Sequence, residues 1–384
     1  MTPADQLARW VALAMVAGFA LSPGLWVSTR AYPLVPVSGR LPRIPYPVDV
    51  VAFGALWALL GLIALMGAFA PGLLAFVALA GALSLWDQSR WQPWFYQYVI
   101  MLAALGLHPW TGAALDTCRA IVAATYLWSG FQKVNTSFAR VTFPWLVAPM
   151  TERLPVGLAR TVAWSGPAVA LGEAAIGVGL LVGPLRDVAV VAAVLMHATI
   201  LLCLGPLGHR VNTVVWPWNV AMAAFVLVLF WRAPDVSTSR ILSVDPGVFH
   251  ALVVLLFGLL PALSFVNCWD SYLSAALYSA NLKSGVIYLT EAGRAALPVA
   301  VQRYVEPGAD GRLELSLSRW SSGETNVPVY PEVRVFKALA REICRHAGDV
   351  ELVVRYRSLA RLVRRRSTAD PGARVIVRYR CGSL

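Results

Sequence analysis

Long apolar runs, separated by short polar connections, occupy the chain from residue 10 to residue 268. They fall at 10–27, 49–70, 72–86, 94–107, 113–134, 157–183, 186–204, 212–231 and 247–268. Because about 20 apolar residues are needed to cross the hydrocarbon core of a bilayer, the pattern predicts about nine transmembrane helices. The third and fourth runs are short, which fits half-helices or segments that enter the bilayer without crossing it.

Two of the connections have unusual compositions. Residues 28–48 contain five prolines and three arginines, which predicts an ordered or extended loop. Residues 135–156, NTSFARVTFPWLVAPMTERLPV, mix aromatic and charged side chains. That mixture favours a re-entrant or surface-lying segment over a membrane span.

The pattern changes near Gly285. Alternating apolar and polar residues predict four strands, at 285–290, 312–320, 350–359 and 373–381, and helical spacing occupies 291–305 and 330–347. We therefore predict an all-α polytopic membrane bundle over residues 1–284. A small α+β domain outside the membrane follows over residues 285–384.

Composition supports a multi-pass integral membrane protein, which we expect in a bacterial inner membrane. Hydrophobic residues make up 58% of the chain and charged residues 14%, against about 25% charged residues in soluble domains. The net charge is +12, and much of the excess lies after Gly285. Such a basic domain fits anionic membrane lipids or a membrane-protein partner. It carries no nucleic-acid recognition motif.

The side of the membrane that the C-terminal domain occupies is left open. With nine crossings, the arginines of the loops on the domain's side outnumber those on the other side, which predicts a cytoplasmic location. The five cysteines include no CxxC pair. We interpret Cys118, Cys203 and Cys268, in apolar runs, as buried small residues, whereas Cys344 and Cys381 pair if the domain faces an oxidising compartment.

Lys133 ends the apolar segment YLWSGFQKVN and is one of three lysines in the sequence. On a helix, Arg119, Tyr126 and Lys133 lie along one stripe, with Ser129 one turn before the lysine. If this stripe faces the bundle interior, burial and repulsion from Arg119 favour a neutral amine that can act as a base. The alternative is a lysine that anchors a helix end at the lipid headgroups.

Glu173 and His197 lie well inside apolar runs. An ionisable side chain at membrane depth is a functional candidate that needs a partner. For Glu173 that partner is Lys133, Arg119 or His197, and the alternative is a protonated acid that links helices. His197 suits accepting or relaying a proton near neutral pH, with a satisfied core histidine as the alternative.

Asn212, Trp216 and Asn219 share one face of a predicted helix, where Pro217 frees a backbone carbonyl. Polar side chains at this depth indicate a substrate cavity or hydrogen bonds between helices. We expect no metal site, because no second histidine stands at ligand spacing. No phosphate-binding loop, GxGxxG or GxSxG motif is present, so we expect no nucleotide cofactor.

The segments YLWSGFQKVN and GEAAIGVGLLVGPLRDVAVVAAVLMHATILLCLG resemble the membrane domain of the vitamin K-dependent gamma-carboxylase family, also called the HTTM superfamily. In that family an aromatic helix ends in a Gly-x-x-Lys motif, matched here by Gly130 and Lys133. Its lysine is thought to deprotonate reduced vitamin K. The resemblance covers about residues 50–280 and implies an acidic residue at Glu173 and a histidine-containing span around His197.

The segment that contains Glu173, GEAAIGVGLLVG, also resembles small DoxX-like membrane proteins, which are linked to thiol and quinone redox chemistry. The C-terminal domain is too short for the large lumenal region that handles the carboxylase family's peptide substrate, which argues against glutamate carboxylation. That family's layout also places the region opposite to the side predicted from arginines.

These observations lead to one hypothesis and two rivals. The hypothesis is an HTTM-type membrane enzyme that binds a quinone-like or other lipid-soluble substrate, with Lys133, Glu173 and His197 as catalytic residues. Arg119, Tyr126, Asn212, Trp216 and Asn219 would bind the substrate. The rivals are a non-catalytic subunit or scaffold of a larger membrane complex, and a carrier with its site at the midplane.

Overall fold

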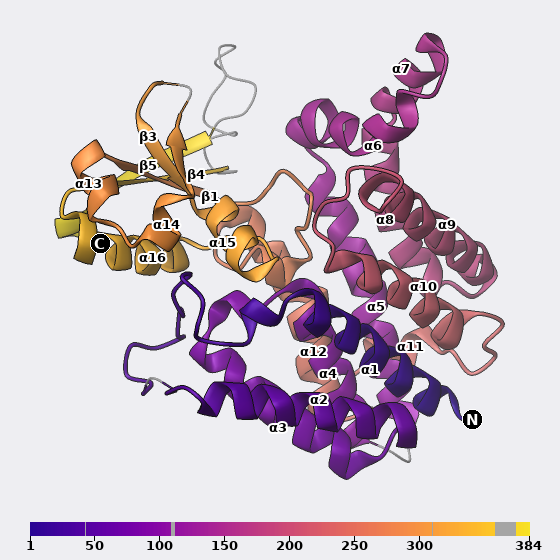
Figure 1. Ribbon diagram of the computed structural model, residues 1–384. Helices are drawn as coiled ribbons and strands as arrows, with labels where there is room; N and C mark the ends of the chain where they lie inside the picture. The colour runs from indigo at the N-terminus through magenta and orange to yellow at the C-terminus, as the bar shows by residue number, and fades with distance from the viewer. Residues whose placement is uncertain (43, 109–111, 309, 358–373) are drawn as a thin grey trace. The chain divides into compact units, whose positions relative to one another are not determined.

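The computed structural model describes residues 1–42, 44–108, 112–308, 310–357 and 374–384. The chain forms two compact units (Figure 1). The first, the helical unit, comprises Met1–Leu21, Gly54–Gly81 and Pro93–Asn281. The second, the sheet unit, comprises Ser22–Phe53, Ala82–Gln92 and Leu282–Leu384.

Each of the nine apolar runs contains helix, which does not by itself confirm the predicted nine membrane crossings. The helices are α1 (Pro3–Leu21), α2 (Val48–Met66), α3 (Ala70–Trp86), α4 (Pro93–Leu107), α5 (Gly112–Lys133), α7 (Val156–Trp164), α8 (Gly166–Leu181), α9 (Arg186–Leu204), α10 (Val215–Phe230) and α12 (Val248–Val253). The last continues as a π-helix, η5 (Val254–Leu259), and a 3-10 helix, η6 (Leu260–Val266). A short helix, α11 (Thr238–Leu242), precedes it.

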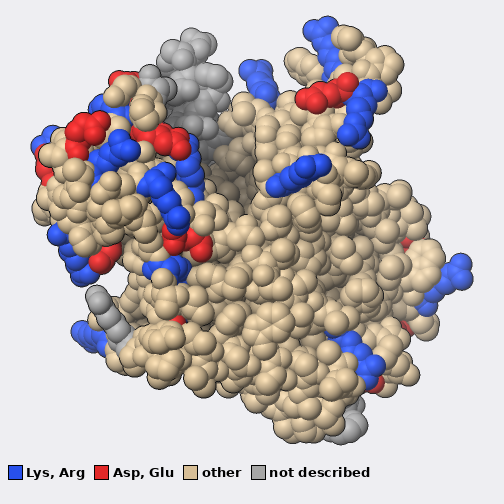
Figure 2. Space-filling model, viewed as in Figure 1, with Lys and Arg blue, Asp and Glu red and all other residues tan. Residues whose placement is uncertain are grey.

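Within the described residues, four helical segments are long and apolar enough to cross a membrane: Pro3–Leu21, Val48–Met66, Gly183–Leu204 and Val248–Val266. The pair α7 and α8, bent by 50°, makes a fifth if it counts as one span. Helices α3, α4 and α10 are apolar but shorter. On the face in Figure 2, the helical unit has a broad surface without charged side chains, which agrees with contact with lipid.

Helix α5 is the central element of the helical unit. It packs against α8, α4, α10 and α12, and its buried positions extend from Ala113 to Gln132. The charges that α5 carries are all paired: Arg119 with Asp116 of the same helix and with Asp235 in the turn before α11, and Lys133 with Glu173 of α8.

Residues 134–155 do not form a full span. A π-helix, η3 (Phe138–Thr142), leads into α6 (Phe143–Thr151). Phe138, Phe143 and Val147 are buried in one cluster with Ala170 of α8 and Cys203 of α9. Two of the aromatic residues that distinguished this segment in the sequence, Phe138 and Phe143, thus pack onto two helices of the unit.

The sheet unit contains one antiparallel sheet in the order β2-β3-β1-β4-β5. Its strands are β1 (Ser284–Leu289), β2 (Val305–Pro307), β3 (Leu313–Ser316), β4 (Glu351–Arg357) and β5 (Arg374–Arg380). Its helices are α13 (Glu291–Ala296), α14 (Val299–Gln302), α15 (Leu317–Thr325) and α16 (Val333–Ala347). The strongly amphipathic α16 packs on β1 and β4 and buries Phe336, Leu339 and Ile343.

The four predicted strands and two predicted helical stretches are present, with three differences. The strand predicted at 312–320 ends at Ser316, where the Ser316 side chain caps α15. The helix predicted at 291–305 is divided at Pro298 and ends in β2, which the pattern did not predict. Residues 358, 359 and 373 of the predicted strands lie outside the described residues.

The sheet unit is discontinuous along the chain, whereas the sequence pattern predicts a single boundary at residue 284. The proline-rich loop belongs to it: Arg30 forms a buried ion pair with Asp87, and the Ala31 N–H donates to Glu324. Burial tends to raise the pKa of Glu324, but hydrogen bonds from Arg303, Ala31 and Tyr304 hold that pKa below its ordinary value.

A disulfide joins Cys344 of α16 to Cys381, directly after β5. Of the cysteines interpreted as buried, Cys118 and Cys203 are buried. The interpretation is wrong for Cys268, which is exposed because it follows the last turn of η6, where Asn267 adopts a left-handed conformation that ends the helix.

Candidate active site in the helical unit

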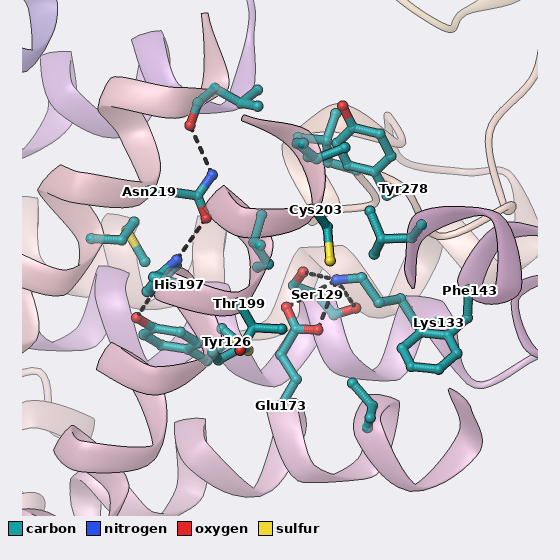
Figure 3. A pocket seen from close by; sticks show the side chains of 18 of the residues that line it. Tyr126, Ser129, Lys133, Phe143, Glu173, His197, Thr199, Cys203, Asn219 and Tyr278 are labelled. Carbon is teal, nitrogen blue, oxygen red and sulfur yellow. Dashed lines mark hydrogen bonds and ion pairs between the residues drawn. The ribbon is translucent and has the colours of Figure 1, made fainter. Parts of the chain in front are cut away.

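A cavity of about 370 Å³ lies within the helical unit. Helices α5, α6, α8, α9 and α10 line it, together with η3 and residues Leu277 and Tyr278. Most of the lining is apolar, and ionisable or hydroxyl groups occupy a few places (Figure 3). An apolar cavity with a few convergent polar groups is the usual form of a small-molecule site.

Lys133 and Glu173 form an ion pair at the cavity wall (Figure 3). The Lys133 ammonium donates to Glu173 Oε1 at 2.9 Å and Oε2 at 2.8 Å, and to Ser129 Oγ at 2.6 Å. The side chains of Lys133 and Glu173 are 12% and 9% exposed. The amine is therefore held by a carboxylate inside the helical unit and does not extend to the surface as an anchoring lysine.

Close packing of α5 against α8 creates this pair. A Cβ atom at Gly130 would lie 2.3 Å from the backbone nitrogen of Ala174 and 2.6 Å from the carbonyl oxygen of Ala170. A Cβ at Gly177 of α8 would lie 2.6 Å from the carbonyl oxygen of Ala123. Glycine on each helix therefore lets the two backbones touch, as small residues do between membrane helices, and Lys133 reaches Glu173.

A second polar group consists of Tyr126, His197 and Asn219, from α5, α9 and α10 (Figure 3). The Tyr126 hydroxyl is 2.6 Å from His197 Nε2, and His197 Nδ1 is 2.8 Å from Asn219 Oδ1. The Asn219 amide donates to the carbonyl oxygen of Val215 at 2.8 Å. All three side chains line the cavity that holds Lys133 and Glu173.

Five of the predicted site residues therefore meet at one cavity: Tyr126, Lys133, Glu173, His197 and Asn219. Arg119 does not, although it shares their stripe on α5. Its guanidinium donates to Asp116 and Asp235 at 3.0 Å and to the Leu229 carbonyl. Fourteen residues of helix separate it from Lys133 by about 21 Å, so Arg119 does not repel the Lys133 ammonium at close range.

Asn212 and Trp216 are also placed differently from the prediction. Helix α10 begins at Val215, and Asn212 precedes it with a left-handed backbone (φ 49°). Asn212 therefore does not share a helical face with Asn219. Its amide donates to the hydroxyl of Tyr278, a cavity residue, while the Trp216 indole donates to the Val211 carbonyl away from the cavity lining.

Several cavity residues were not predicted as site residues, among them Phe138, Phe143, Thr199, Cys203 and Tyr278. The unusual composition of residues 135–156 was the one available signal for Phe138 and Phe143. The described residues contain no group of three or more His, Cys, Asp or Glu side chains arranged to hold a metal ion.

Comparisons of the sequence with protein-family models and with curated proteins, and of the structure with solved structures, find no match.

Proposed function

We propose that this protein is a membrane enzyme that removes a proton from a hydroxyl group of a quinone-like substrate in its reduced form, or of another lipid-soluble substrate, bound in the cavity. The observation that carries the proposal is the Lys133–Glu173 pair at the wall of a largely apolar cavity of about 370 Å³. The resemblance of the segment around Gly130 and Lys133 to the HTTM superfamily points to the same lysine.

The pair supplies a base by internal proton transfer. Movement of one proton from the Lys133 ammonium to the Glu173 carboxylate, across 2.8 Å, turns the ion pair into a neutral amine and a carboxylic acid. A surrounding of low polarity favours the neutral forms. The amine then accepts the proton of a substrate O–H group, which leaves the substrate oxyanion beside a new ammonium.

The cavity wall favours a substrate with a hydrocarbon portion. Phe138, Phe143, Leu146 and Val147 on one side and Leu195, Met196 and Ile200 of α9 on another are apolar. Burying such a substrate is favourable at roughly 25 cal/mol per Å² of apolar surface. The acidic hydroxyl would remain near Lys133, Ser129 and Glu173, one of the two polar groups of the lining.

We also propose nine crossings in a bacterial inner membrane. The sheet unit combines residues 22–53, 82–92 and 282–384, so these three stretches lie on one side. An even number of crossings must therefore separate each from the next. Two helices, α2 and α3, lie between the first and second stretch. Six spans lie between the second and third if α7 with α8, and α12 with η5 and η6, each count as one.

A chromogenic ligand tests the proposed function. An alkylated nitrophenol absorbs at longer wavelength as phenolate than as phenol, so its spectrum reports proton transfer to the protein. We expect phenolate in the purified protein at a pH where the probe stays protonated in empty micelles. Lys133→Met removes the amine base and should leave the bound probe protonated.

Lys283→Met is the matched control, because Lys283 donates to both Glu332 oxygens, at 2.9 and 2.7 Å, in the sheet unit. It should leave the probe spectrum unchanged. Lys133→Arg should abolish phenolate formation, because arginine does not give up its proton. A probe that binds but stays protonated in the unmodified protein would reject the base and favour a carrier, and absence of binding would favour a subunit or scaffold.

A further inference from the structure

The hydrogen bonds among Tyr126, His197 and Asn219 determine which atom of each side chain carries a proton. The Asn219 amide nitrogen donates to Val215, so Oδ1 is the atom that faces His197. A carbonyl oxygen only accepts, and His197 Nδ1 must therefore carry a hydrogen. In the neutral ring Nε2 is then an acceptor.

The phenol proton follows from this tautomer. Tyr126 lies 2.6 Å from the unprotonated Nε2 and donates its single proton there. Tyr126 and His197 are 2% and 6% exposed, so water has little access to rearrange the bond. Both nitrogens of His197 are occupied. Tyr126 keeps oxygen lone pairs and has no proton left to donate.

We infer that Tyr126 selects ligands that present a hydroxyl group over ligands that present a carbonyl or ether oxygen at that position, and that His197 and Asn219 are the positioning residues that create this selectivity. The inference rests on the proposed function, because it concerns the second polar contact of the same bound substrate. A hydroxyl donates to the Tyr126 oxygen, whereas a carbonyl or ether oxygen faces another acceptor across the contact.

The placement of the residues makes the two contacts independent. Tyr126 and Lys133 are two turns apart on α5, and both line the cavity. The Tyr126 phenol is hydrogen-bonded to His197 of α9, and the Lys133 amine is hydrogen-bonded to Glu173 of α8. A ligand with two hydroxyls therefore engages the Lys133–Glu173 pair with one and Tyr126 with the other.

The experiment compares two ligands that differ at one oxygen. The first is a para-dihydroxybenzene with a decyl chain, and the second is its monomethyl ether, both titrated anaerobically into protein in detergent. Each offers one hydroxyl to Lys133 and Glu173. We expect the diol to bind about tenfold more tightly than the ether, the range of one net hydrogen bond.

Two variants reduce this preference for different reasons. Tyr126→Phe removes the acceptor, so the diol should bind more weakly, whereas the ether should lose no affinity. His197→Phe frees the phenol proton, so the ether should bind more tightly while the diol keeps its affinity. Asn219→Leu removes the oxygen that fixes the tautomer of His197. It should therefore also make the ether bind more tightly, as His197→Phe does. A merely structural role would weaken both ligands alike.

Tyr98→Phe and His250→Phe are matched controls. Both residues are buried in the helical unit and lie outside the cavity lining, and His250 bonds Thr117 and the Ile241 carbonyl. Each should keep the tenfold preference. Equal binding of diol and ether, or a preference that survives Tyr126→Phe, overturns the inference. If neither ligand binds, or Lys133→Met leaves binding unchanged, the proposed function fails with it.

Discussion

Two buried lysines of this protein have the same kind of partner but different surroundings. Lys133 donates to Glu173 and Lys283 donates to Glu332, each at 2.7 to 2.9 Å. Lys133 also borders a cavity in the helical unit. A buried pair by itself is weak evidence for function, because such pairs also occur as structural contacts. The cavity beside Lys133 is what would give a ligand access to its amine.

The Lys133–Glu173 pair should show strong coupling in stability. Lys133→Met leaves the Glu173 carboxylate without its ammonium partner, which should lower the free energy of unfolding by about 1–3 kcal/mol. The double variant Lys133→Met, Glu173→Leu removes both charges and should recover most of that loss. Denaturant unfolding in detergent, or thermal unfolding, measures both effects. If the loss in unfolding free energy of the double variant equals the sum of the losses of the two single variants, the two side chains are not coupled as an ion pair.

At the scale of elements, the contact of α5 with α8 determines the geometry of the site. Gly130 and Gly177 each face the backbone of the other helix. The ion pair lies one turn from Gly130 along α5 and one turn from Gly177 along α8. A change in helix separation at either glycine therefore changes the distance between amine and carboxylate directly.

Gly130→Ala should consequently damage both stability and the ion pair. The new methyl group would meet backbone atoms at 2.3 and 2.6 Å, and backbone cannot move aside as a flexible side chain can. We expect a loss of about 1–3 kcal/mol and loss of phenolate formation by the bound nitrophenol. Gly177→Ala should act alike.

Gly172→Ala is the matched control on α8, because nothing lies within 4 Å of the position that its new methyl group would take. It should leave the free energy of unfolding unchanged or raise it by up to about 1 kcal/mol, because alanine favours a helix over glycine. An unchanged unfolding curve and probe spectrum for Gly130→Ala would show that the helices separate without cost, and would reject this account.

The sequence predicted the helical runs and most of the sheet, because both depend on local periodicity. It also indicated Lys133, Glu173 and His197, because charged or ionisable groups inside apolar runs are conspicuous. Their assembly into one cavity depends on contacts between α5, α8, α9 and α10, which no local pattern contains.

The errors have physical causes of the same kind. Arg119 shares a helical stripe with Lys133, but a stripe carries no information on distance along the axis. Asn212 was assigned to a helix because apolar residues follow it, although Arg210 and Asn212 have left-handed backbones and α10 begins only at Val215. The discontinuous sheet unit depends on pairings such as Arg30 with Asp87, which are distant in sequence.

At the scale of the whole molecule, the distribution of arginines and the disulfide place the C-terminal domain on opposite sides of the membrane. The arginine count predicts a cytoplasmic C-terminal domain, whereas the Cys344–Cys381 disulfide indicates an oxidising compartment. Two of the loop arginines on the domain's side, Arg30 and Arg90, form buried structural contacts. Arg30 pairs with Asp87, and Arg90 donates to the carbonyl oxygens of Leu25, Trp26 and Leu83. Burial also lowers the pKa of Arg90 to about 10.

We therefore expect the sheet unit on the oxidising side of the membrane. An alkaline phosphatase fused after Leu384 is active only outside the cytoplasm, and a green fluorescent protein fused before Met1 is fluorescent only inside it. Both reporters should be active, because the proposed nine crossings would place the two ends on opposite sides. Exchanging the reporters is the control and should silence both. A fluorescent reporter at Leu384 would contradict the orientation, and two ends on the same side would contradict an odd number of crossings.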